Sequence, residues 1–73
     1  MTVKNKKFLE LMKKEGLEKI NLEKGNGYFW LWSDDDYWSN KILDLESSSI
    51  FVNSFKDQSI ENWVRDIKEL LNI

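Results

Sequence analysis

The sequence contains no cysteine, no histidine and no proline among its 73 residues. Without cysteine the chain has neither a disulfide nor a thiolate metal ligand, and without histidine it lacks the commonest general base. Only carboxylate, lysine, serine or tyrosine chemistry remains open, and no catalytic or cofactor motif is present. The sequence therefore predicts a protein that is not an enzyme, with no cofactor, no bound metal and no small-molecule substrate.

Long apolar runs are absent as well. No stretch approaches the ~20 apolar residues of a membrane span, and the segment MTVKNKKFLELMKKEG has no continuous apolar stretch of signal-peptide type. We therefore expect a cytoplasmic protein with no membrane partner. No repeat or linker divides the chain, which predicts one compact domain over residues 1–73. A domain this small hides only ~60% of its unfolded surface, so bulky side chains or self-association must support its core.

The charges are unevenly distributed along the chain. Residues 1–24 carry seven lysines and four glutamates, whereas residues 25–73 carry four basic and nine acidic side chains. The lysines of the first segment are typical of a solvated helix face, and their excess is too small to indicate a phosphate-binding groove. This distribution disfavours nucleic acid as a partner.

Periodicity and turn residues predict six secondary-structure elements. Apolar residues at helical spacing indicate two long helices, and the second of them, within SIENWVRDIKELLNI, has Ser59 as a good N-cap. Alternation in GLEKINLEKG and the apolar run YFWLW indicate strands on either side of an Asn-Gly turn. The predicted elements are a helix over 2–15, strands over 17–23 and 28–33, a short helix over 35–46, a strand over 49–53 and a helix over 59–71.

These elements predict a two-layer α+β domain with the order α-β-β-(short α)-β-α. Its small three-stranded, mainly antiparallel sheet is covered by the N- and C-terminal helices, because the apolar stripe of each long helix must be buried.

The length of the turn decides which face of the YFWLW strand meets the core. An even loop of two or four residues turns Phe29 and Leu31 inward and leaves the stripe of Tyr28, Trp30 and Trp32 outside the first core. A three-residue loop with a bulge reverses this arrangement. Asn-Gly is the preferred two-residue pair, so the sequence favours the even loop.

Three interpretations of this stripe are open. Trp38 and Ile42 of the middle helix could cover it in a second small core, it could be a protein-binding or homodimer face, or it could be a stacking platform for bases or sugars. Bases need basic neighbours, whereas Asp34, Asp35 and Asp36 follow the stripe. These aspartates lack the ligand spacing of a calcium loop, and we expect them to begin a helix.

The arrangement of three short segments resembles that of small uncharacterised proteins carried by phages, plasmids and integrated mobile elements. The matching segments are Gly27-Tyr28-Phe29, Ser49-Ile50-Phe51-Val52 and Ser59-Ile60-Glu61-Asn62-Trp63. No activity or site comes with this resemblance. It implies action by binding, often on host or defence machinery.

We therefore expect a protein-interaction module that docks a protein partner or its own copy through an aromatic strand with an acidic rim. The expected partner-binding residues are Tyr28, Trp30, Trp32, Asp34, Asp35, Asp36 and Tyr37. The alternative is a single-stranded nucleic-acid binder or an acidic DNA mimic with anti-restriction activity.

Overall fold

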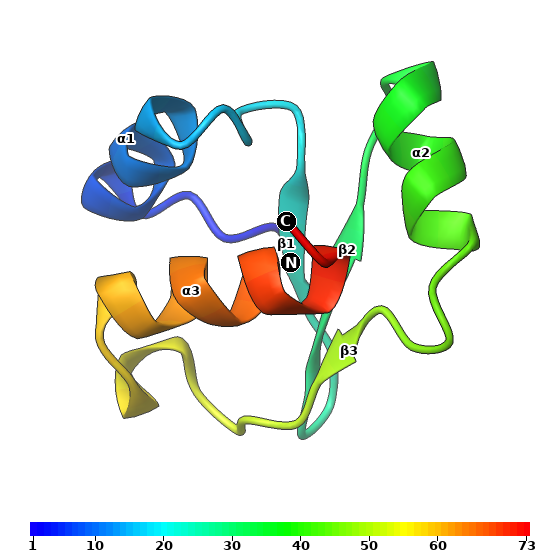
Figure 1. The fold of residues 1–73 in the computed structure, drawn as a ribbon. Coiled ribbons are helices and arrows are strands. Elements are labelled where there is room, and N and C mark those ends of the chain that lie inside the picture. Colours follow the sequence, from blue (N-terminus) through cyan, green and yellow to red (C-terminus); the bar gives the residue numbers. More distant parts are fainter.

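The computed structural model describes all 73 residues and has a small antiparallel sheet with helices around it (Figure 1). The predicted α+β class is confirmed. The elements are α1 (Lys6–Lys14), β1 (Asn21–Lys24), β2 (Phe29–Trp32), α2 (Asp36–Leu43), β3 (Ser49–Ile50), the 3₁₀ helix η1 (Phe55–Asp57) and α3 (Ile60–Leu71).

The sheet has the order β1-β2-β3, and both pairings are antiparallel. In the first pairing Leu22 lies opposite Leu31 and Glu23 lies opposite Trp30. The N-terminal residues extend along the other edge of β1, where Thr2 forms a bridge with Glu23. The amide N–H of Val3 donates to the Leu22 carbonyl at 2.8 Å there. The free edge of β1 is thereby covered.

The hydrophobic core lies between the sheet and the two long helices. Figure 1 shows α3 crossing in front of the strands with α1 beside it, while α2 stands apart on the other side of the strands. All fully buried side chains are apolar and form one cluster. They are Phe8, Met12, Leu17, Ile20, Leu22, Phe29, Leu31, Ile42, Trp63, Val64, Ile67 and Leu71.

Trp63 of α3 is the central side chain of this core. Its side chain is 0% exposed, and its ring stacks on Phe55 at 5.5 Å between centroids and meets Phe29 edge-on at 4.8 Å. The indole Nε1 donates a hydrogen bond of 2.7 Å to the Phe55 carbonyl. A buried indole N–H needs such an acceptor, so this bond fixes the turn before α3 against the helix.

The first helix is shorter than the predicted range of 2–15. It begins at Lys6, because Asn5 accepts a hydrogen bond from the Phe8 amide at 3.0 Å and the preceding residues pair with β1. It ends near Gly16, whose φ of +77° is the left-handed conformation expected after a helix.

The strand predicted over 17–23 is also displaced, to Asn21–Lys24. Ile20 and Leu22 are buried as the alternation predicts. Leu17 is buried as well, because residues 17–20 form a turn closed by a hydrogen bond of 3.0 Å from the Ile20 amide to the Leu17 carbonyl. Hydrophobic alternation here marks the buried side chains without specifying strand pairing.

Three further elements are shorter in the structure than the sequence predicts. The strand predicted over 28–33 is Phe29–Trp32, and the helix predicted over 35–46 is Asp36–Leu43 with Asp35 as its N-cap. The strand predicted over 49–53 is only Ser49–Ile50, because the Val52 amide donates back to the Ile50 carbonyl at 3.0 Å and turns the chain. The helix predicted over 59–71 is Ile60–Leu71, with Ser59 as its N-cap as expected.

The two tryptophans Trp63 and Trp30 should respond differently to the same conservative change. Trp63→Phe removes a buried hydrogen bond and leaves the Phe55 carbonyl unpaired, so the free energy of unfolding should fall by about 1–3 kcal/mol. Trp30→Phe, at a half-buried position with no indole hydrogen bond, should change it by less than about 0.5 kcal/mol. Urea unfolding followed by circular dichroism measures both, and equal losses would contradict the core described above.

Candidate functional site

A four-residue loop sets the orientation of the aromatic strand. Lys24 pairs with Phe29, so residues 25–28 connect the strands, and the Gly25 amide donates to the Tyr28 carbonyl at 2.8 Å. This even loop confirms the favoured prediction. Phe29 and Leu31 are buried, whereas Trp30 and Trp32 lie on the opposite face of β2.

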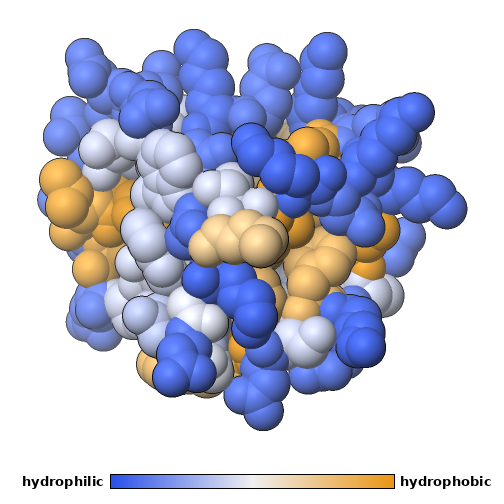
Figure 2. All heavy atoms as spheres, turned by 180° about the vertical axis from the view of Figure 1, so that it is seen from behind, coloured by the Kyte–Doolittle hydropathy of each residue, from blue (hydrophilic) through white to orange (hydrophobic).

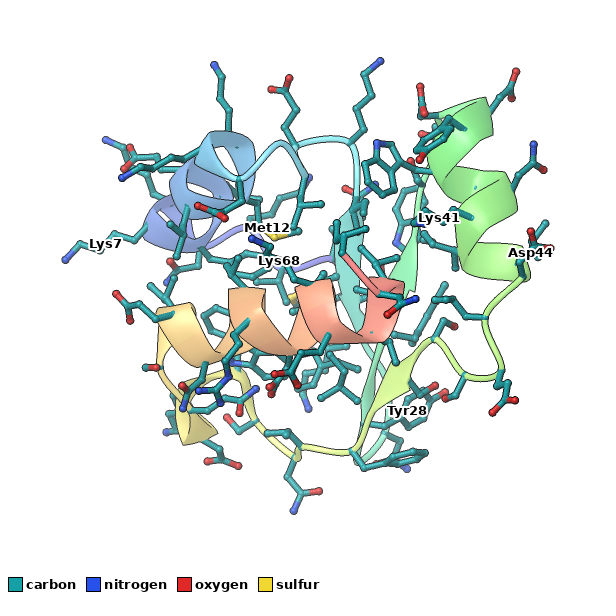
Figure 3. The ribbon with its side chains drawn as sticks, viewed as in Figure 1. Lys7, Met12, Tyr28, Lys41, Asp44 and Lys68 are labelled. Carbon is teal, nitrogen blue, oxygen red and sulfur yellow. The ribbon has the colours of Figure 1, made fainter.

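The outward side chains form a continuous surface, which we call the aromatic face: Tyr28, Trp30, Trp32 and Phe51. The first three are half-buried, and Phe51, 6.5 Å from Tyr28 between ring centroids, is 80% exposed. In Figure 3 the labelled Tyr28 lies beside β3, at the end of the sheet away from α2. Neither α1 nor α3 covers this face, because both bury their apolar stripes on the other side.

Trp32 is fixed by a carboxylate on the neighbouring strand. Its indole Nε1 donates to Glu23 Oε1 at 3.0 Å, and the same oxygen accepts from the Thr2 hydroxyl at 2.6 Å. Glu23 Oε2 pairs with the Met1 amino group. These hydrogen bonds, from the amino group and Thr2 above all, lower the pKa of Glu23 from 4.5 to about 2. Glu23 therefore holds Trp32 and the N-terminal residues in place together.

Trp30 differs because its indole N–H has no acceptor within the chain, whereas those of Trp32 and Trp63 donate to Glu23 and Phe55. A half-buried indole with a free donor is typical of aromatic side chains at protein interfaces. Trp30 is thus the tryptophan of the aromatic face that retains an unused polar group.

A groove of about 400 Å³ lies between β2 and α2, and we call it the β2–α2 groove. Its β2 wall includes Trp30 and Trp32, and its opposite wall includes Ser39, Leu43 and Glu46. Leu43 is 77% exposed, so the groove has an open aliphatic rim. Figure 2 views the molecule from behind, and hydrophobic atoms reach the surface at its left edge, on the side of α2.

The aspartates before α2 have separate positions. Asp35 caps the helix by accepting from the Trp38 amide at 3.2 Å and pairs with Lys19 at 3.3 Å, and both contacts lower its pKa, the amide more. Asp36 lies in the first turn of the helix, where the helix dipole favours negative charge, and Asp34 is exposed. The run therefore begins a helix, as the sequence predicts.

Not all of the predicted partner-binding residues come together. Successive residues of a helix are rotated by about 100°, so Tyr37 and Lys41 lie on one flank of α2 while Ser39 and Leu43 lie on the other. Tyr37 is 65% exposed and contacts Trp38 at 5.1 Å between ring centroids, but it does not line the groove. Tyr37 therefore lies apart from the stripe with which the sequence analysis grouped it.

The structure has no separate second core in which Trp38 and Ile42 cover the stripe. Ile42 belongs to the main core, and Trp38 packs against that same cluster. The aromatic face keeps its exposure because α2 stands at the edge of β2 instead of across the sheet. Three side chains at the site were missed: Leu43, Glu46 and Phe51. The adjacent apolar pair Ile42-Leu43 was the available signal that α2 presents two apolar flanks.

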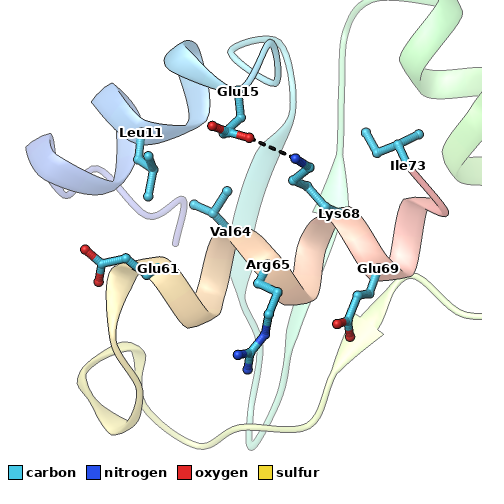
Figure 4. A pocket seen from close by; sticks show the side chains of 8 residues that line it. All are labelled: Leu11, Glu15, Glu61, Val64, Arg65, Lys68, Glu69 and Ile73. Atoms are coloured by element: carbon cyan, nitrogen blue, oxygen red, sulfur yellow. Dashed lines mark hydrogen bonds and ion pairs between the residues drawn. The ribbon is translucent and has the colours of Figure 1, made fainter.

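A second hollow lies between α1 and α3, and Figure 4 shows the side chains that line it. Lys68 Nζ and Glu15 Oε1 meet across it at 2.8 Å, and this contact lowers the pKa of Glu15. Leu11 and Val64 lie beside the pair. The ion pair that spans this hollow joins the two helices.

The structure contains no group of three or more acidic side chains arranged to hold a metal ion. None of its helices has both the length and the apolar character needed to cross a membrane. Comparison with known proteins found no matching family model, no matching curated sequence and no matching solved structure.

The lowered pKa of Glu23 predicts a defined acid response. A carboxylate with a folded pKa of about 2 and an ordinary value of 4.5 contributes stability that is fully present above pH 4.5 and is lost as the pH falls through about 2. NMR titration of the Glu23 carboxyl carbon should give this pKa, and the Trp32 indole N–H resonance should move with the same midpoint. A Glu23 midpoint near 4.5 would contradict the hydrogen bonds described above.

Proposed function

We propose that this protein is a cytoplasmic, non-enzymatic interaction module that docks a protein partner through the aromatic face and the adjacent acidic segment. The observation that carries the proposal is Trp30: a half-buried tryptophan with a free indole N–H, on a sheet face that neither long helix covers. Tryptophan and tyrosine provide large contact areas at low entropic cost and are enriched among the residues that dominate binding energy.

The surroundings of Trp30 support a protein partner more than a nucleic acid. A single-strand binding platform places basic side chains along the stacked aromatic rings. Here the segment beside the aromatic face carries aspartates, while the lysines of α1 lie across the molecule from α2 (Figure 1). The resemblance to mobile-element proteins makes a host protein the favoured class of partner.

Affinity capture from a bacterial lysate tests this proposal with three single variants. Trp30→Ala and Phe51→Ala each remove a ring of the aromatic face, and each should reduce capture of the partner more than about tenfold. Tyr37→Ala is the matched control, because it removes an exposed ring from the other flank of α2. That variant should capture the same protein as the intact chain.

Circular dichroism and melting temperature must confirm that each variant is folded. Phe51 is 80% exposed, so its replacement is decisive even if Trp30→Ala alters stability. Equal capture by all four proteins would contradict docking through the aromatic face.

A further inference from the structure

The β2–α2 groove is lined by one carboxylate, Glu46, and belongs to a segment with further exposed acidic side chains. Four exposed carboxylates on this segment take part in no salt bridge, and the only paired one is Asp35. The four are Asp34, Asp36, Asp44 and Glu46. Figure 3 shows Asp44 at the outer side of α2, and Glu46 lines the groove itself.

The basic side chains of this region do not neutralise the groove. Lys41 lies on the opposite flank of α2 from Ser39 and Leu43 and does not line the groove. Lys19 is held by Asp35 at 3.3 Å. Lys24, at the end of β1, donates to the Asn53 carbonyl at 2.6 Å. The remaining lysines of the N-terminal half lie in or next to α1, on the far side of the molecule in Figure 1. A cation placed in the groove would therefore meet aromatic rings, an aliphatic rim and the unpaired carboxylate of Glu46.

We propose, building on the docking function above, that the occupant of the β2–α2 groove is a basic segment of a partner protein. A lysine or arginine side chain can lay its aliphatic stem on Leu43. Its charged head group can then lie over the Trp30 ring and pair with the Glu46 carboxylate. An apolar residue beside it in the partner segment fits against the remaining aromatic face. Complementary charge across such an interface raises the association rate and rejects acidic partners.

The same charges disfavour two other occupants. A symmetric contact with a second copy through this face would bring identical carboxylates together, since a two-fold interface joins the same patch on both subunits. A nucleic acid would place phosphates against the acidic rim. A basic polypeptide is the class that gains from both the rings and the carboxylates.

The test is an NMR titration of the ¹⁵N-labelled protein with three synthetic ten-residue peptides. The first alternates lysine and arginine with leucine, and the other two replace its basic residues with glutamine or glutamate. The basic peptide should shift the Trp30 indole and Leu43 amide resonances, with an affinity that falls as salt is raised. The glutamate peptide should cause no shift, and the glutamine peptide should bind more weakly.

Two charge-reversal variants separate a local effect from a change in net charge. Glu46→Lys reverses a groove carboxylate, whereas Glu10→Lys makes the same change in charge at an exposed position on α1. Glu46→Lys should lower the affinity for the basic peptide by roughly three- to fivefold, which is the range expected for an exposed charge pair. Glu10→Lys should lower this affinity clearly less.

Any of the following results would overturn the inference. Equal binding of the three peptides, equal effects of the two variants, or shifts centred on α1 would remove the basic segment as the occupant. So would groove shifts caused by a single-stranded oligonucleotide, or self-association seen by sedimentation that Glu46→Lys abolishes. If capture from the lysate depends on Trp30 while the basic peptide does not bind, the docking function stands and this inference fails.

Discussion

The four-residue loop between β1 and β2 is the constraint on which the rest of the structure depends. Side chains of a strand alternate between two faces, so a loop longer or shorter by one residue would exchange the inner and outer sets of β2. With the observed loop, Phe29 reaches Trp63 at 4.8 Å between ring centroids. Gly27 permits the turn, since its φ of +85° is strained for other residues. The same loop that completes the core therefore places Trp30 outside it.

The aromatic face follows from how few elements the chain has to cover its sheet. Both long helices bury their stripes on one side, and α2 adds only Ile42 to that core. A small domain often leaves part of its sheet uncovered, but the uncovered part usually carries polar side chains. Here it carries three large aromatic residues, and Glu23 fixes one of them in position. That combination of apolar surface and fixed geometry is suited to binding.

Local patterns anticipated the elements whose determinants are close in sequence. Ser59 and the stripe of α3 specify a helix without distant partners, and Asn26-Gly27 specifies the turn. The pairing of Thr2 with Glu23 could not be anticipated, because it joins residues far apart in the chain and replaces the expected first helical turn. The outward stripe was therefore foreseen. The groove beside it was not, since the flank of α2 that faces β2 depends on tertiary packing.

Hydrogen–deuterium exchange of the four indole N–H groups, resolved by NMR, tests the central claim most directly. The account predicts that the Trp30 indole exchanges faster than the Trp32 indole, which is bonded to Glu23, and at a rate set by solvent access. It also predicts that the Trp63 indole exchanges only through global unfolding, because its N–H is bonded to the Phe55 carbonyl. A Trp30 indole protected as strongly as that of Trp63 would mean that the strand is turned the other way. The aromatic face would then belong to the core.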